Sequence, residues 1–390
     1  MSSTDNQAFL DNVKKALAPF KTGVKRRAQG VLKYDYLVPA GYYQEQWDWD
    51  GFFIGLALAQ EIPSEAIFLR NWALNYMSLA RSDGYSPACV TSKGPETGTR
   101  AMLMKPFLAQ GAYLSSVFLN DFSWIKPHYA ILERMATYRW KHVWNKKYDL
   151  AVWQSSMESG ADNNLAALDF PKNSVVATDA NSFIYREFLA LSKISEVLGE
   201  RAKAKKYNGV AKGISERVNK YLWDETDQTY YNIDTTTGNL IRRMSYNSVH
   251  PIWAGIAPQK RAKAFIEKNL LNPKKLWSTY GVRTLAKDDK EYHNTNMIKP
   301  HSNWQGPIWP IANFFFVEAL IRYGYQKEAI MAAKAVAKIC IDDIGKSGGM
   351  HENYDAETGN PIAAPNFISW NLLVPIYLQD AIENTVSFTL

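Results

Sequence analysis

The chain has 390 residues, of which 46% are hydrophobic and 21% are charged, a composition that is typical of a globular protein with a large core and that excludes a disordered chain. The net charge of +7 comes from lysines and arginines scattered along predicted helix faces, as in 260–265, and this pattern indicates no nucleic-acid partner. The two cysteines, Cys89 and Cys340, lack the spacing of a metal site, and their small number excludes a disulfide scaffold.

The first twenty residues have no apolar signal core behind their basic residues. Elsewhere no stretch approaches the roughly 20 apolar residues that a membrane span requires. We therefore expect a soluble, cytoplasmic protein without a membrane partner, and we make no prediction of its oligomeric state.

Helical periodicity dominates the rest of the chain. Its strongest instance is 178–198, where apolar side chains recur at steps of three and four, Thr178 or Asp179 can cap the start, and Gly199 can close the end. The predicted helices in chain order are 8–20, 50–61, 64–80, 106–120, 127–143, 178–198, 200–222, 248–256, 259–270, 306–323, 325–341 and 367–383.

Short and long connections alternate between these helices. The long ones are 81–105, 144–178, 223–247, 271–305 and 342–366. Helix pairs repeated around a ring give an all-α toroid whose long loops gather at one end. The segment 229–234, followed by Gly238, indicates a β-hairpin within one long loop. Because no linker interrupts the pattern, we expect residues 1–390 to form a single domain.

Two long connections each carry an acidic residue among small and amide residues: Asp162 in 155–164 and Glu352 in 348–355. Glycoside cleavage needs such a pair, because one carboxyl gives a proton to the leaving oxygen while the other draws a proton from water. Acidic residues in turns are also commonly solvated and idle, so neither loop is sufficient alone. For an inverting pair, we expect the carboxyls to lie about 6.5 to 9.5 Å apart across a pocket.

Aromatic residues make up 13% of the chain, and several accompany polar residues near predicted helix starts. Trp47, Trp49 and Asp50 precede one helix, which Asp50 could also cap, and Trp304 and Gln305 precede another. Sugar rings stack on aromatic faces, although a large helical core uses aromatic residues as well.

Several ordered motifs carry a family resemblance that covers nearly the whole chain, from Tyr43 to Trp370. The chain resembles the trehalase-like inverting glycosidases, and above all glycoside hydrolase family 63, which includes bacterial oligosaccharide α-glucosidases and the mannosylglycerate and glucosylglycerate hydrolases. The motifs are QWDWDGFF at 46–53, ESGADN at 158–163, NWQGPIWP at 303–310, HENYDAETGNP at 351–361 and NFISW at 366–370.

The resemblance implies an (α/α)6 barrel that hydrolyses glycosides with inversion of the anomeric centre. It matches Asp162 to the general acid and Glu352 to the general base. Asp50 matches the carboxylate that holds the nonreducing sugar, and Tyr43 occupies the position from which glycerate-processing relatives contact the aglycone. The predicted substrate-binding residues are Tyr43, Trp47, Trp49, Asp50, Lys105, Arg186, Trp304, Gln305 and Trp370.

The chain departs from the glycerate hydrolases at several of these positions. Lys105 before Pro106 resembles the oligosaccharide α-glucosidase branch instead, and Asn303 and Gln305 replace a usual Tyr and Arg. Met157 stands where a Trp often precedes the ESG motif. The acid/base pair is unaffected by these changes.

We expect an exo-acting enzyme that removes one α-glucosyl unit from a small carbohydrate, with no cofactor and no metal. Asp224 and Asp227 could bind calcium, but their pattern is more typical of a turn. An alternative is a mannosylglycerate or glucosylglycerate hydrolase, in which Lys105 or Arg186 would meet the glycerate carboxylate.

Two other classes of function remain open. A sugar epimerase can share this barrel and usually works with two facing histidines; the candidates here are His250, His293, His301 and His351. An inactive carbohydrate-binding toroid is disfavoured by the intact acid/base pair. Whether two histidines or two carboxylates face each other distinguishes the epimerase from the hydrolase.

The proposed chemistry also predicts the protonation of the pair. Asp162 should have a raised pKa, through desolvation and the charge of Asp50. Glu352 should stay ionised, with hydrogen-bond donors from the backbone or from His351 and Asn353.

Overall fold

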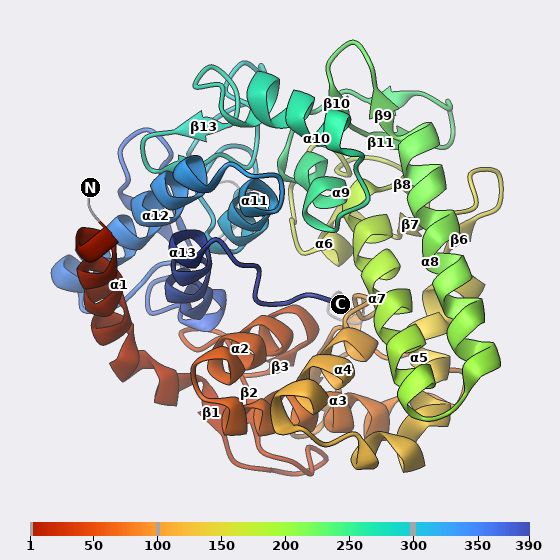
Figure 1. The fold of residues 1–390 in the computed structure, drawn as a ribbon. Helices are drawn as coiled ribbons and strands as arrows, with labels where there is room; N and C mark the ends of the chain where they lie inside the picture. Colours follow the sequence, from red (N-terminus) through yellow and green to blue (C-terminus); the bar gives the residue numbers. More distant parts are fainter. Residues whose placement is uncertain (1–2, 99–101, 297–301) are drawn as a thin grey trace.

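A computed structural model describes residues 3–98, 102–296 and 302–390, and in this part of the chain two concentric rings of helices form a barrel. Figure 1 looks along its axis and shows the inner helices surrounded by the outer ones. Each inner helix packs on the next, and the turn before the last one packs on the first and closes the ring. The inner helices are α2 (Asp48–Glu61), α4 (Leu108–Leu119), α7 (Thr178–Val197), α9 (His250–Trp253), α11 (Pro310–Arg322) and α13 (Val374–Glu383), with the 3-10 turn Ser369–Leu373 before α13.

The outer helices cover this ring and alternate with it along the chain. They are α1 (Ser3–Leu17), α3 (Ala66–Leu79), α5 (Tyr129–His142), α8 (Arg201–Tyr221), α10 (Gln259–Phe265) and α12 (Gln326–Ser347). Helix α1 packs on α13, so the first helix of the chain covers the last one. This arrangement is the (α/α)6 barrel that the sequence predicted.

The inner helices are buried on nearly all sides, whereas most outer helices are buried mainly on one face. Every residue of 48–59 in α2 is buried, whereas α8 buries Tyr207, Ala211, Ile214 and Val218, at steps of four, three and four. A helix enclosed on all sides is apolar all round, and a covering helix needs only one apolar stripe.

Short strands lie in the connections between helices. They are β1 (Lys25–Arg26), β2 (Tyr36–Leu37), β3 (Gln46–Trp47), β4 (Cys89–Thr91), β5 (Gly94–Pro95), β6 (Trp144–Asn145), β7 (Leu150–Trp153), β8 (Val175–Val176), β9 (Trp223–Asp224), β10 (Thr229–Tyr230), β11 (Asn232–Asp234), β12 (Leu240–Ile241), β13 (Trp277–Ser278), β14 (Gly281–Val282), β15 (Asn353–Tyr354) and β16 (Pro361–Ala363). The largest sheet is antiparallel with the order β12-β11-β8-β7-β6, and it joins two long connections.

The long connections all lead from an outer helix into the start of an inner one. The returns from inner to outer helices are short, as between α2 and α3 or between α7 and α8. The N-terminal ends of the inner helices therefore meet the long loops at one end of the barrel, where the two acidic loops also lie.

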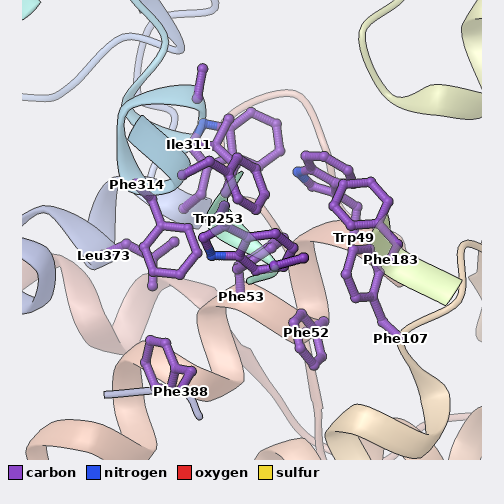
Figure 2. Packing of buried hydrophobic residues seen from close by; sticks show 14 of the residues in the cluster. Trp49, Phe52, Phe53, Phe107, Phe183, Trp253, Ile311, Phe314, Leu373 and Phe388 are labelled. Atoms are coloured by element: carbon purple, nitrogen blue, oxygen red, sulfur yellow. The ribbon is translucent and has the colours of Figure 1, made fainter. Parts of the chain in front are cut away.

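Aromatic side chains fill the barrel below that end. Trp49 contacts the rings of Phe53, Phe107, Phe183 and Phe315, with centroids 5.5 to 6.3 Å apart. Figure 2 shows Trp49, Phe107 and Phe183 together in this core. The high aromatic content of the chain is thus explained largely by the core.

The C-terminal segment lies across the middle of the ring in Figure 1. Phe388 is buried and packs against Phe314 with ring centroids 6.0 Å apart. This segment covers the end of the aromatic core that lies away from the long loops.

The predicted helices are confirmed, with differences of a few residues at most ends. Five deviate more. The helix predicted at 8–20 begins at Ser3, that at 325–341 extends to Ser347, and that at 306–323 begins only at Pro310. Segment 367–383 opens with the 3-10 turn Ser369–Leu373, and 248–256 contains a 3-10 turn and the four-residue α9. Asp50 lies in the first turn of α2 rather than at its cap, since the helix begins at Asp48. Segment 229–234 is divided between two sheets, and its second half forms a hairpin with β12 around Gly238. Within the described residues, no helix combines the length and apolar character needed to cross a bilayer.

Candidate active site

Three carboxyl groups gather where the long loops meet the inner ring. Asp50 is in the first turn of α2, Asp162 follows the short helix α6 (Ser156–Ser159), and Glu352 directly precedes β15. Burial raises the pKa of Glu352 well above its ordinary value, and the charges of Asp162 and Asp50 raise it further. Residues that are remote in the sequence therefore lie within electrostatic reach of one another. The separation of the Asp162 and Glu352 carboxyls stays a prediction.

The loop that carries Asp162 is built from a single helical turn and a sharp reversal. The Ser155 side chain caps α6 by accepting from the Glu158 backbone N–H, and Gly160 ends it in the left-handed conformation with φ of 84°. The Glu158 carboxylate forms a buried ion pair with Arg139 of α5. Glu158 thus anchors the loop, and Asp162 is left to face the site.

Asn163 ties this loop to the segment before α11. Its side-chain Oδ1 accepts from the Trp304 backbone N–H at 2.6 Å, and its Nδ2 donates to Asn303 Oδ1 at 3.2 Å. In return, Gln305 Nε2 donates to the Asn163 carbonyl at 2.9 Å. Gln305, a predicted substrate contact, therefore already serves the framework of the loop.

Burial raises the pKa of Asp162 to about 6, while the Ser302 hydroxyl and the Lys105 charge act in the opposite direction. The raised pKa and its main cause, desolvation, agree with the sequence-based expectation for a general acid. Asp50 does not contribute to this shift, contrary to what we expected.

Asp50 lies against a buried cation. Ser369 Oγ donates to Asp50 Oδ1 at 2.6 Å, while burial and the neighbouring Asp48 raise the Asp50 pKa to about 7. Asp48 accepts from the Lys105 backbone N–H at 2.6 Å, and Lys105 Nζ lies 3.4 Å from its other oxygen. The Lys105 ammonium also lies over the Trp49 ring, 5.4 Å from its centroid. Lys105 is thus buried beside Asp48, within electrostatic reach of Asp50 and Asp162.

Glu352 is held by its backbone. Its N–H donates to the Ala363 carbonyl at 2.9 Å, and Tyr354 exchanges two backbone hydrogen bonds with Ile308. The expectation that His351 and Asn353 keep Glu352 ionised is wrong in this structure. The His351 ring bonds to Asp343 instead, and no partner among the described residues satisfies the Asn353 side chain. Burial among other carboxyls therefore favours the protonated form of Glu352.

The predicted aromatic contacts differ in their exposure to the site. Trp49 is 4% exposed and packed in the core under Lys105. Trp304 stacks on Trp309 at 4.1 Å, and Trp370 approaches Trp309 at 6.2 Å. The indole N–H groups of Trp304 and Trp370 are buried without a partner in the described residues. Such donors usually find an acceptor, so these two can serve substrate oxygens.

Tyr43 and Trp47 form a second aromatic group. Their rings meet edge to face at 6.4 Å, and Tyr43 also meets Phe367 at 6.0 Å. Both are only partly buried. They join the segment before α2 to the one before Trp370, so two of the sequence motifs are adjacent in space.

Arg186 requires a correction. It lies two turns along α7, and its guanidinium donates to the Phe388 carbonyl at 2.6 Å and to Gln110 Oε1 at 3.2 Å. It also stacks on Trp253 at 4.6 Å. Because its donors hold the C-terminal segment inside the core, we do not retain it as a substrate contact.

The histidines do not form the facing pair of an epimerase within the described residues. His250 is buried among aromatic rings, which lowers its pKa to about 3, and it bonds to the Asn247 carbonyl. His293 accepts from the Thr295 N–H, and His351 bonds to Asp343. His301 lies outside the described residues. Carboxylates rather than histidines converge at the site.

Sequence reasoning missed several polar neighbours of the carboxyls. Ser369, Asn163 and Ser302 all contact or influence a predicted site residue. The available signal was position: each lies within two residues of a predicted site residue in the sequence.

Comparison with known proteins agrees with this geometry. Residues 42–370 match the family described as the mannosylglycerate hydrolase MGH1-like glycoside hydrolase domain. The mannosylglycerate hydrolase of Rubrobacter radiotolerans is 26% identical over 201 residues, which are 51% of this chain and 43% of that protein. The mannosyl-oligosaccharide glucosidase of Saccharomyces cerevisiae is 24% identical over 261 residues, with 60% of this chain and 30% of the relative covered. The chain thus spans less than half the length of these two relatives.

Solved structures show the same fold. The GH63 mannosylglycerate hydrolase from Thermus thermophilus, crystallised with glucose, has a TM-score of 0.69 at 18% identity and covers 95% of this chain and 99% of that one. The neutral trehalase of Saccharomyces cerevisiae also gives 0.69, at 15% identity, with 90% and 76% covered. From the family match over most of its length, the chain belongs to glycoside hydrolase family 63.

Proposed function

We propose that this protein is an inverting, exo-acting α-glycosidase that releases one sugar unit from the nonreducing end of a small substrate. The observation that carries the proposal is the gathering of three carboxyls, the buried Asp50 and Glu352 and the partly buried Asp162. Desolvation raises the pKa of Asp162 to about 6 and that of Asp50 to about 7, and it raises the pKa of Glu352 well above its ordinary value. Such a cluster holds protons near neutral pH, as acid/base catalysis requires.

Each carboxyl has a distinct role in the proposed reaction. Asp162 gives its proton to the glycosidic oxygen as the bond to the anomeric carbon breaks. Glu352 takes a proton from water as that water forms the new bond on the opposite face of the sugar. In the reactive state, Asp162 must be protonated and Glu352 must be ionised. Burial alone favours the opposite arrangement, because it raises the pKa of Glu352 well above its ordinary value. A water that donates a hydrogen bond to Glu352 favours its ionised form.

The wall of the pocket supports the exo-acting mode. Asp50, with Ser369 and Lys105 beside it, offers acceptors and donors to the hydroxyls of a terminal sugar. Below this wall the barrel is filled by the aromatic core around Trp49. A chain could therefore enter only by its end. We further propose that residues 1–390 act as one catalytic domain, because α1 of the outer ring packs on α13, the last helix of the inner ring.

The favoured substrate is an α-linked glucoside or disaccharide, because Lys105 follows the oligosaccharide α-glucosidase pattern. A mannosylglycerate or glucosylglycerate is the second candidate, because residues 42–370 match the mannosylglycerate hydrolase-like domain. We propose to incubate the protein with kojibiose, trehalose, mannosylglycerate, glucosylglycerate and other α-linked glucosides and mannosides, and to record sugar release and the anomer first formed. Release of a β-anomer from an α-linked substrate is expected. Retention of configuration, or release of internal oligosaccharides without monosaccharide, would refute the proposal.

A further inference from the structure

A single buried carboxylate on the outer ring collects the side chains on both sides of Glu352. Asp343, in α12, is 2% exposed. Its Oδ2 accepts from the His351 backbone N–H at 2.9 Å, from His351 Nδ1 at 2.9 Å and from the Tyr354 hydroxyl at 3.0 Å. Its Oδ1 accepts from the Ser347 hydroxyl at 2.8 Å. Four donors therefore converge on one side chain that contacts neither the sugar site nor its aromatic wall.

These contacts matter because the Glu352 carboxyl has little support of its own. Within the described residues, no hydrogen bond holds that carboxyl, whose pKa responds only to burial and to the charges of Asp162 and Asp50. Its position is consequently set by the backbone of 351–354. The strand register shifts between Asn353 and Tyr354, and irregularities of this kind re-aim side chains beside active sites.

The charge on Asp343 is suited to hold this backbone. Hydrogen bonds from His351, Ser347 and Tyr354 hold its pKa below the ordinary value against the effect of burial. An ionised carboxylate accepts only, so His351 carries a proton on Nδ1. Hydrogen bonds to a charged acceptor are roughly twice as strong as neutral ones.

We propose that Asp343 is the positioning residue of the general base: through His351 and Tyr354 it fixes the backbone from which Glu352 reaches the attacking water. The proposal rests on the proposed function, in which Glu352 activates that water. The described hydrogen bonds of the Asp343 side chain go to Ser347, His351 and Tyr354 and to none of the proposed sugar-binding residues, so its effect should fall on turnover and not on binding of the sugar.

The chain offers a matched control. Asp380 of α13 is also 2% exposed and gathers donors from Ser387 and Thr385, but it holds the C-terminal segment at the other end of the barrel. Asp343→Asn and Asp380→Asn both replace a buried acceptor by an amide that cannot accept on both atoms. Both variants should melt at a lower temperature, and only the first should affect the base.

The measurement uses two substrates of the sugar that the wild-type protein releases: its O-glycoside and its α-glycosyl fluoride. In the fluoride, the C1–F bond breaks to give a fluoride ion that needs no proton, while water still adds at C1 and gives its proton to Glu352. Hydrolysis of the fluoride thus depends on the base and not on Asp162.

We expect Asp343→Asn to lower kcat at least roughly tenfold on both substrates with KM changed less than about threefold, and Asp380→Asn to leave both kcat values within about twofold. Equal kcat values for the two variants, measured well below both melting temperatures, would overturn the proposal. If Asp343→Asn does not fold, Tyr354→Phe removes a hydroxyl that donates to Asp343 and accepts from the His351 backbone N–H. Its kcat should fall at least roughly threefold on both substrates, and a wild-type kcat would overturn the proposal equally. Full activity of Glu352→Gln would instead contradict the proposed role of Glu352 as general base, on which this inference rests.

Discussion

At the scale of single residues, the proposed chemistry rests on Asp162 and Glu352. We expect Asp162→Asn and Glu352→Gln each to lower kcat by at least roughly a hundredfold, which is the usual scale for loss of a general acid or base. The asparagine and glutamine side chains keep the size of the residues that they replace. In the described residues, the Glu352 carboxyl has no hydrogen bond that Glu352→Gln would remove. Thermal melting beside the assay separates loss of fold from loss of chemistry. A folded variant with near-native turnover would contradict the proposed roles.

Lys105 allows the substrate to be tested through a single cation. Because its ammonium lies within 3.4 Å of Asp48 and lowers the pKa of Asp50 and Asp162, we expect it to act on the sugar ring. Lys105→Ala should therefore reduce kcat/KM by similar factors on a neutral disaccharide and on a glycerate conjugate, as steady-state kinetics will show.

The control for Lys105 is Lys172, an exposed lysine on the neighbouring long loop. Lys172→Ala should behave like the wild type on the neutral substrate. A selective rise in KM for the anionic substrate in Lys105→Ala would show instead that Lys105 meets a carboxylate.

The residues of the site were predictable to an unequal degree. Asp162 and Glu352 could be assigned because each lies in a recognisable loop motif of the family. The partner of Arg186 is a carbonyl at residue 388, and no local pattern in the sequence connects the two. The charge of Glu352 likewise depends on which carboxyls the fold places near it.

At the scale of elements, Asn163 joins the acid loop to the segment before α11. Asn163→Ala removes the acceptor of the buried Trp304 backbone N–H, and an unsatisfied buried donor costs about 1 to 3 kcal/mol of stability. We expect a lower melting temperature together with a reduced kcat, because the loop that presents Asp162 loses its tie.

Asn145 provides the comparison for this loop. Its side chain caps the hairpin between β6 and β7 by accepting from two backbone N–H groups. Asn145→Ala should lower the melting temperature without a change in kcat. If both asparagine variants keep wild-type turnover, the tie at Asn163 has no part in catalysis.

The helices were predictable because their hydrophobic period depends only on nearby residues. The exceptions are informative: 248–256 and the segment before Pro310 contain turns whose shape is set by tertiary contacts, such as the His250 packing among aromatic rings. Most β-strands escaped prediction for another reason, since they are two or three residues long and too short for an alternating pattern to show.

The whole molecule carries a pH dependence in its core. Burial and the charge of Asp380 raise the pKa of Glu318 from 4.5 to about 8. A buried acid with a raised pKa stabilises the fold at low pH, and this contribution is lost progressively as pH rises from 4.5 to about 8. The melting temperature should therefore fall across this range.

Glu318→Gln tests this explanation. Glutamine is uncharged at every pH and can still accept from the Trp253 indole N–H. We expect the fall in melting temperature between pH 5 and pH 8 to be shallower in the variant, as calorimetry will show. An identical slope would assign the effect to other carboxyls.

The ring itself was predictable from the alternation of short and long connections, but the path of the C-terminal segment across it was not. Nothing in the sequence indicates that residues near 388 return to the axis and bond to α7, because that contact spans 202 positions.

The blocked far end of the barrel has a kinetic consequence. Aromatic side chains and the Phe388 segment occupy the barrel axis, so in the proposed reaction a bound molecule can leave only the way it came. After cleavage the departing group lies nearer the mouth and the freed sugar lies beneath it, so the two must leave in a fixed order. The sugar leaves last, from the form of the enzyme that next accepts substrate, and it should therefore compete with substrate as an inhibitor.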